Sequence, residues 1–516
     1  MVLFTREGDT ARITESLVAM RDGVRLYTRC TVPKDGTTFP IVFIRTPYEP
    51  AHNGTPHNAN DPVAAPYIER GYAVVTQHCR GKGDSEGDCI PYSPFERTDA
   101  LDTLEYIRAL PFYQGEIYLT GGSYLATVHL SYLSAKPHDV KGACLQIQTD
   151  RLFYRNYRNG LNYRLNNIGW WSSMVSRVYP NADLSRAYER PYIDAAKRVF
   201  GRDIPEFTDT LIHNTCDEFW QNDDKWNVVE SLEIPTLFVE GWYDFYVEGM
   251  SDMWRRLPGA TKAKSAMLVG PYGHSTVVSK KAEYPLPSGN IPGDFVLDWF
   301  DSIREGRPIG FAERGKVKYY SIGADAWYAA DGFDGCRAYD RLWLGDHTLS
   351  RTEGEGAVLG YDYDPEHVAN VFPSFDIFRA HAAGSVDSIL SFVSEPIASD
   401  TAYFGGVRVH LNVSSDCEDT AFYARIYLVD GGEAYNLTEA FGGLVHLTGD
   451  YTPGTVATID LETPPIAFTL KAGMRVRVDI ASESGNYLPH PNVEKTQIAH
   501  NEIHTKGSYV ALPLQK

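Results

Sequence analysis

The sequence predicts an α/β core, built on a mostly parallel sheet with both faces covered, followed by an antiparallel β-sandwich. Up to about residue 311, short continuous apolar runs alternate with segments of helical periodicity, which is typical of parallel strands buried under helices. From about residue 312 onward the helical periodicity fades, and short alternating segments are separated by Gly, Pro and Asp turns. That second pattern is typical of an antiparallel sandwich.

The composition indicates a globular protein of two or three domains. A length of 516 residues exceeds one hydrophobic core, and a hydrophobic content of 43% is enough to fill more than one. The formal net charge of -19 argues against a nucleic-acid partner, which would need a basic face. Seven cysteines without close pairing, no leader-like start and no membrane-length apolar run predict a cytoplasmic location and no membrane partner. A homodimer is compatible with the sequence.

The first elements follow this plan in order. Residues 16–30 predict a hairpin that turns at an Asp-Gly pair. Residues 41–45 and 73–77 are continuous apolar runs, as expected for strands covered on both faces. Residues 99–110 then show helical periodicity with an acidic start.

The next strand and helix meet at a serine. Residues 116–120 predict a strand and residues 125–133 a helix, so Ser123 lies in a strand-to-helix turn after two glycines. Such a turn lifts a serine hydroxyl off the sheet and directs helix N–H groups at a developing oxyanion. The usual motif has glycine two places after the serine, where this chain has Leu125 followed by Ala126. The motif alone is therefore also explained by an ordinary glycine-containing loop.

A helical insertion is predicted between two parts of the parallel sheet. Residues 151–230 are rich in aromatic side chains and contain no clear buried strand, and residues 151–200 carry nine Lys or Arg but three Asp or Glu. The parallel pattern resumes at residues 234–240 and 265–269, and a helix near 295–300 closes the unit.

Two polar residues follow the resumed strands and complete a catalytic pattern with Ser123. Asp244 follows one strand and His274 the other, at the strand ends where open α/β sheets bind ligands. The chain order Ser, Asp, His is that of α/β-hydrolases. A serine hydroxyl needs an imidazole to take its proton, and the imidazole needs a carboxylate to fix its tautomer. Taken singly, Asp244 could cap a helix and His274 could be a packed or solvated residue.

Several motifs together resemble the cocaine esterase / X-prolyl dipeptidyl-peptidase (CocE/NonD) family of serine hydrolases. The matching segments lie at residues 45–48, 71–75, 80–87, 122–125, 241–244, 270–274, 394–396 and 413–416. The resemblance implies an α/β-hydrolase core with an inserted helical cap and a C-terminal antiparallel β jelly-roll domain. The boundaries expected on this basis are 1–145 and 232–311 for the core, 146–231 for the cap and 312–516 for the jelly roll.

The same resemblance implies roles for individual residues. Ser123 would be the nucleophile, His274 the general base and Asp244 the residue that orients it. The oxyanion hole would combine the Tyr48 hydroxyl with the backbone N–H of Tyr124. The alternative for Tyr48 is an aromatic at a strand end that packs on the core.

The chain departs from the family at positions that bear on the substrate. His78 stands near the expected site, where the family usually has a different sequence before its Arg-Gly loop. Relatives that hydrolyse amino-acid esters carry carboxylates just after the triad aspartate, whereas Phe245 and Tyr246 stand there in this chain. Recognition of a free amine by that device is not expected, and Asp150 at the cap entrance is the remaining candidate.

The cap suggests a pocket for an aromatic or carboxylate-bearing acyl compound. Trp170 and Trp171 are its candidate aromatic contacts. Arg155, Arg158 and Arg164 are candidates for binding an anionic group, with a solvated face paired to the acidic body as the alternative. No zinc, phosphate-loop or Cys-x-x-Cys signature is present, and His500 and His504 resemble a metal pair only superficially, so no metal or organic cofactor is expected.

The function predicted from the sequence is a serine hydrolase that cleaves an ester or amide of a small acyl compound through an acyl-enzyme. One alternative keeps the triad but makes the protein an acyltransferase or an X-prolyl-type peptidase. A second alternative is a ligand-binding homologue that has lost activity through the altered serine turn.

Overall fold

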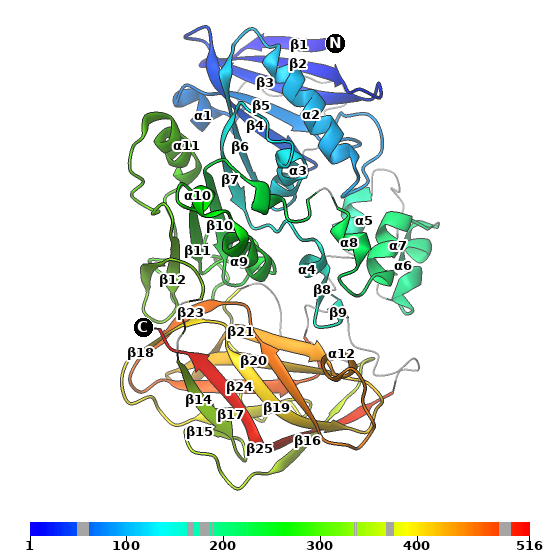
Figure 1. Ribbon diagram of the computed structural model, residues 1–516, viewed down its shortest axis with the longest axis vertical. Helices are drawn as coiled ribbons and strands as arrows, with labels where there is room; N and C mark the ends of the chain where they lie inside the picture. Colours follow the sequence, from blue (N-terminus) through cyan, green and yellow to red (C-terminus); the bar gives the residue numbers. More distant parts are fainter. Residues whose placement is uncertain are drawn as a thin grey trace.

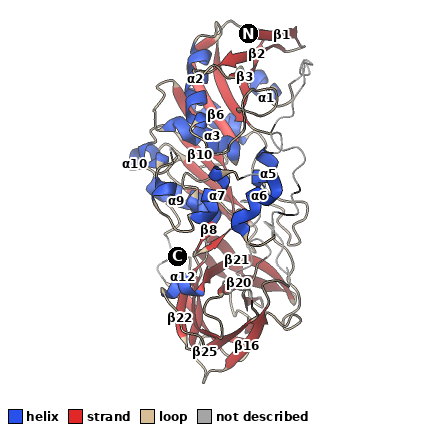
Figure 2. Ribbon diagram, turned by 90° about the vertical axis from the view of Figure 1, so that its right-hand side faces the viewer, coloured by secondary structure: helices blue, strands red, loops and turns tan. Residues whose placement is uncertain are grey.

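The computed structural model confirms the predicted combination of an α/β core and a β-rich C-terminal part, which lie end to end along the long axis (Figures 1 and 2). The structure describes residues 1–48, 61–162, 170–175, 183, 186, 189–201, 203–223, 225–334, 336, 338–367, 376–484 and 497–515.

The α/β core is built on one eleven-stranded sheet in the order β1-β2-β3-β5-β4-β6-β7-β10-β11-β12-β13. The central pairs from β5 to β12 are parallel, and the pairs at both ends are antiparallel. The strands are β1 (Val2–Glu7), β2 (Ala11–Ala19), β3 (Arg25–Pro33), β4 (Phe39–Thr46), β5 (Ala73–His78), β6 (Tyr113–Gly122), β7 (Val140–Gln146), β10 (Thr236–Gly241), β11 (Ala266–Gly270), β12 (Val317–Ser321) and β13 (Ala326–Ala330).

Helices cover both faces of this sheet. The helices are α1 (Ala65–Glu69), α2 (Phe95–Arg108), α3 (Tyr124–Leu133), α9 (Val247–Arg256), α10 (Gly259–Lys262) and α11 (Phe295–Glu305). Val42 of β4 packs in one core with Trp299 of α11, whereas its neighbour Phe43 packs in the other core with Leu104 of α2 and Leu130 of α3. Consecutive residues of one strand thus enter opposite cores, which explains the continuous apolar runs in the sequence.

The cap follows β7 and contains short elements that gather beside the core (Figure 1). They are α4 (Phe153–Asn156), the small hairpin β8 (Tyr157–Arg158) and β9 (Leu161–Asn162), α5 (Trp170–Val175), η3 (Tyr192–Asp194), α6 (Ala195–Phe200), α7 (Pro205–Ile212), α8 (Glu218–Gln221) and η4 (Val228–Ser231). Aromatic and aliphatic side chains of α5, α6 and α7 form a separate small core, in which Trp171 contacts Phe207 with ring centroids 5.7 Å apart.

The C-terminal part contains a ten-stranded, mostly antiparallel sheet and the two-stranded sheet β18-β23. Its elements are β14 (Tyr339–Leu344), β15 (Thr348–Ser350), β16 (Val358–Tyr363), β17 (Leu390–Ser394), β18 (Thr401–Gly405), β19 (Arg408–Ser415), β20 (Ala421–Asp430), β21 (Glu433–Gly443), α12 (Leu444–Thr448), β22 (Ala457–Glu462), β23 (Ile466–Leu470), β24 (Arg475–Ala481) and β25 (Ala499–Pro513).

The structure differs from the expected boundary at residue 312. Strand β12 pairs in parallel with β11, and β13 pairs with β12, so both belong to the sheet of the α/β core rather than to the sandwich. Strand β13 is the partly buried edge strand and β12 lies next to it. In β12 a lysine, Lys318, stands between apolar residues, so this short strand alternates as sandwich strands do.

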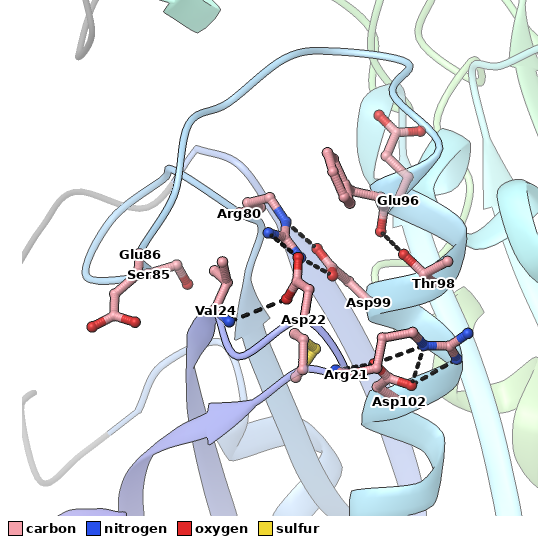
Figure 3. Close-up of polar contacts among 12 residues, drawn as sticks. Arg21, Asp22, Val24, Arg80, Ser85, Glu86, Glu96, Thr98, Asp99 and Asp102 are labelled. Carbon is pink, nitrogen blue, oxygen red and sulfur yellow. Dashed lines mark hydrogen bonds and ion pairs between the residues drawn. The ribbon is translucent and has the colours of Figure 1, made fainter.

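Ion pairs fix the loop after β5 to helix α2 (Figure 3). Arg80 contacts Asp99 of α2 at 2.6 Å and Asp22 of the β2-β3 turn at 2.8 Å. Arg21, also in that turn, forms a second pair at 2.7 Å with Asp102, one helical turn further along α2. The loop that leads from β5 to α2 therefore starts from an anchored position.

A buried histidine on α3 makes the stability of the core depend on pH. Burial lowers the pKa of His129 to about 3, so its ring is neutral in the folded protein and charges on unfolding below about pH 6.5. The unfolded state then binds more protons, and stability falls as the pH drops. Between pH 7 and pH 5, we expect the wild type to lose about 2 kcal/mol more unfolding free energy than His129→Gln. Urea unfolding followed by tryptophan fluorescence measures this difference, and an equal loss in both proteins would contradict it.

Candidate active site

Ser123 lies where β6 passes into α3, in a backbone conformation that few residues other than glycine adopt. Its φ is 56° and its ψ is -127°, and its N–H donates to Gln146 O of β7 at 2.9 Å. A Cβ atom at Gly121 would lie 2.6 Å from the backbone of Leu125, so this glycine is needed for the close turn. Ala126, the departure noted in the sequence, is fully buried against the sheet, and its N–H donates to Ser123 O.

The structure brings Ser123, His274 and Asp244 together at the carboxyl edge of the sheet. Ser123 Oγ lies 2.8 Å from His274 Nε2, and His274 Nδ1 lies 2.6 Å from Asp244 Oδ2. The Asp244 side chain is completely buried, and its other oxygen accepts the N–H of Tyr246 at 2.8 Å. A carboxylate held by two donors orients the imidazole so that its free nitrogen can accept the serine proton.

Two neighbours shape the surroundings of this relay. Phe245 stacks on the His274 ring, with ring centroids 4.7 Å apart and planes 21° apart. Glu240 is completely buried, and burial, together with the negative charge of Asp244, raises the pKa of its carboxyl well above the usual value. A neutral Glu240 leaves Asp244 as the negative partner of His274.

The two candidate oxyanion donors belong to residues that line the same cavity as Ser123. Tyr124 is the first residue of α3, so its N–H has no carbonyl of the helix to bond. The Tyr48 hydroxyl accepts a hydrogen bond from Trp170 Nε1 at 3.3 Å. The residue as a whole is 48% exposed. Burial of this hydroxyl raises the pKa of Tyr48, against weaker opposing effects of hydrogen bonds with Trp170 and Ser123. The phenol therefore keeps its proton and can donate a hydrogen bond to an oxyanion.

Ser123 and His274 open into a cavity of about 470 Å³ with aromatic walls. The wall side chains come from the core, the loop before α2 and the cap, and they are Tyr48, Tyr92, Tyr124, Ile147, Arg155, Trp170, Phe245 and Tyr246. Arg155 is buried, with its guanidinium 4.6 Å from the ring centre of Trp170. Among the described residues that line the cavity, none is Asp or Glu.

Four other predicted contacts lie outside this cavity. Asp150 is buried in an ion pair with Arg256 of α9, and Arg158 pairs with Glu248 at 2.7 Å. His78 is buried against the Tyr27 ring and accepts the N–H of Asp84, so it supports the Gly-rich loop rather than the site. Trp171 belongs to the small cap core. Each of these side chains turns toward a partner that local sequence does not reveal, so the structure does not bring it to the catalytic cavity. Arg164 lies outside the described residues.

Tyr92 lines the cavity and was not singled out from the sequence. It stands in the irregular loop before α2, where no periodicity or motif marks a functional side chain. Its positive φ of 63° is a structural signal, since bulky residues rarely adopt that conformation.

The described residues contain no group of three or more His, Cys, Asp or Glu side chains arranged to hold a metal ion. The two histidines of β25 have other partners, because His500 contacts Asp362 and His504 contacts Ser414, each at 2.8 Å. No helix in the described part of the chain has the length and apolar character needed to span a bilayer.

Comparisons with known proteins place the chain among relatives with hydrolase names. Residues 22–276 match the model of the X-Pro dipeptidyl-peptidase (S15) family, and residues 310–510 match that of the X-Pro dipeptidyl-peptidase C-terminal non-catalytic domain. Cocaine esterase from Rhodococcus sp. (strain MB1 Bresler) is 23% identical over 99% of this chain and 100% of its own length.

Two solved structures share the fold over nearly their whole length. An aminopeptidase from the marine sediment archaeon Thaumarchaeota archaeon has a TM-score of 0.84 at 19% identity, covering 99% of this chain and 98% of its own. An α-amino acid ester hydrolase has a TM-score of 0.79 at 21% identity, and the match covers 97% of this chain and 96% of the hydrolase chain.

The Tyr48 hydroxyl provides a direct test of the site. Removing one oxyanion donor typically costs about 10²–10³ in rate, so we expect Tyr48→Phe to slow the reaction of Ser123 with an activated ester by this factor. Because burial raises the pKa of the phenol, the defect should be the same at pH 7 and pH 9. Stopped-flow release of p-nitrophenol at both pH values measures it. A defect that vanishes at pH 9, or an unchanged rate at pH 7, would contradict the assignment.

Proposed function

The chain belongs to the cocaine esterase / X-prolyl dipeptidyl-peptidase (CocE/NonD) family of serine hydrolases, and on that premise we propose that it hydrolyses an ester or amide of a small acyl compound through an acyl-enzyme at Ser123. The observation that carries the proposal is the continuous chain of contacts Ser123–His274–Asp244, which opens into an aromatic cavity beside the Tyr48 hydroxyl.

The proposed reaction has two halves that use the same relay. Ser123 Oγ attacks the substrate carbonyl carbon while its proton passes to His274 Nε2, and Tyr48 with the Tyr124 N–H stabilises the oxyanion. Collapse of the tetrahedral intermediate breaks the bond to the alcohol or amine, which leaves with the proton from His274. Water then loses a proton to His274 as it attacks the acyl-enzyme, and the carboxylic acid is released.

The cavity lining favours substrates with a neutral or anionic acyl group over substrates whose acyl group carries a free α-ammonium. An ammonium in a desolvated site needs a carboxylate partner, and the described lining residues offer Arg155 but no Asp or Glu. The X-prolyl-type peptidase alternative, which would require capture of a free amino terminus, receives no support from these residues. The proposed setting is the cytoplasm, because all seven cysteines are free thiols and five of them are buried.

Covalent labelling separates the enzyme from a binding protein of the same fold. A fluorophosphonate should label one serine per chain, at Ser123, because only an activated hydroxyl reacts. In Ser123→Ala, labelling should disappear and ester hydrolysis should fall by about 10⁴-fold or more. Mass spectrometry of the intact chain and its peptides gives the stoichiometry and the position. An unlabelled wild type would favour the binding homologue, and release of the acyl group mainly to added amine rather than water would favour an acyltransferase.

The absence of acidic lining residues predicts a preference between matched substrates. We expect kcat/KM for the ethyl ester of 3-phenylpropionate to exceed that for the ethyl ester of phenylalanine by about tenfold or more at about pH 6, where the amine is largely protonated. The two substrates differ only in the amino group, so the ratio reports on its recognition. Equal values, or a preference for the phenylalanine ester, would show that an amine is accepted.

A further inference from the structure

A second cavity of about 600 Å³ lies next to the catalytic one, between the cap and the loop before α2. Its walls are mainly apolar and include Leu152, Trp171, Phe219 and Trp220, while Asp209, Asp223 and Lys225 also line it. This cavity has no part in the mechanism described above. Tyr92 and Arg155 line both cavities. The two spaces therefore meet at a shared wall.

The Tyr92 ring forms the aromatic part of this wall. It contacts Tyr124 and Trp170 of the catalytic cavity, with ring centroids 5.4 Å and 5.6 Å away, and Trp171 of the second cavity at 6.4 Å. The Arg155 guanidinium lies 5.2 Å from the ring centre, and the Lys225 ammonium lies 5.6 Å from it. Contacts on several sides hold the ring in its place between the cavities.

The backbone of Tyr92 is held in an unfavourable conformation by two hydrogen bonds. Its φ is 63°, and its N–H donates to Glu96 Oε1 at 2.8 Å and to the Tyr124 hydroxyl at 3.1 Å. Glu96 is buried in α2 and lies 3.6 Å from the buried Lys225. Bulky residues with positive φ persist only where the surroundings determine them, and they concentrate at ligand-contacting sites. This observation is independent of the cavities and marks the same residue.

The proposed mechanism puts this wall on the acyl side of the reacting carbonyl. The leaving group takes its proton from His274, so it occupies the side of the site formed by His274 and Phe245. Tyr92 packs instead on Tyr124 and Trp170. Tyr124 carries one of the two proposed oxyanion donors, and Trp170 donates a hydrogen bond to the hydroxyl of the other, Tyr48. An acyl chain that extends away from the leaving group would run toward Tyr92.

We propose that Tyr92 is a specificity-determining residue that limits the length of the acyl group, and that the second cavity is a distal acyl subsite closed off by its ring. The proposal rests on the proposed function of Ser123. With Tyr92 in place, the enzyme accepts compact acyl groups; without the ring, apolar chains extend into the second cavity, along Trp171 and Trp220.

The test compares p-nitrophenyl butyrate with p-nitrophenyl octanoate. The wild type should prefer butyrate in kcat/KM. Tyr92→Gly and Tyr92→Asn both remove the ring, and both residues tolerate a positive φ, so the backbone conformation is retained. In each variant we expect the octanoate-to-butyrate ratio to rise by about tenfold or more, because several methylenes gain an apolar site. Tyr92→Phe keeps the ring and loses only the hydroxyl, so it should keep the wild-type ratio.

Each outcome supports or contradicts the proposal that the Tyr92 ring limits the length of the acyl group. A wild type that hydrolyses octanoate as well as butyrate overturns the proposal without any variant. A ratio unchanged in both truncated variants, with fluorophosphonate labelling of Ser123 intact, also overturns it while leaving the proposed function standing. Loss of labelling in the wild type would instead remove the proposed function itself. Adding Asn222→Trp, which fills the second cavity from its rim, should reverse the gain of Tyr92→Gly.

Discussion

The position of the site depends on the register of parallel strands at one edge of the sheet. Gly122 of β6 lies opposite Gln146 of β7, Gln146 lies opposite Val239 of β10, and Gly241 of β10 lies opposite Gly270 of β11. The turns that follow β6, β10 and β11 therefore begin at the same edge. A shift of one residue in any of these pairs would reverse which face its side chains occupy and separate the hydroxyl from the imidazole.

The C-terminal β-rich part takes part in the same site through the residue beside Asp244. Phe245 stacks on His274 and also packs against a cluster that includes Tyr423 of β20 and Phe441 of β21. Tyr243, on the other side of Asp244, donates its hydroxyl proton to Asn436 O of β21 at 3.1 Å. Residues of β20 and β21 thus contact both neighbours of Asp244. These contacts join the α/β core directly to the C-terminal β-rich part, so the two parts are docked without a flexible linker.

Electrostatics distinguish the cavity from the rest of the molecule. The chain carries a formal net charge of -19, yet the described lining residues of the catalytic cavity include no carboxylate and include the buried Arg155. Acidic side chains near the site lie behind its walls: Glu240 is buried beside Asp244, Asp150 is paired with Arg256, and Glu96 holds the backbone of Tyr92. The carboxylates named here support the site structurally, while the described lining of the catalytic cavity is aromatic and neutral to positive.

The amino-acid sequence by itself determined the core strands and the turns that end them. Strands such as β4 and β10 are buried on both faces, so they appear as apolar runs. Local chemistry marks Ser123, Asp244 and His274 just after β6, β10 and β11. Only the tertiary structure decided which sheet β12 and β13 join, because short strands near the end of a sheet carry no sequence signal that distinguishes the two sheets. It also decided that His78 and Asp150 turn to distant partners and that Tyr92 stands between two cavities. Side-chain direction in loops depends on contacts made by residues far apart in the chain, which no local pattern encodes.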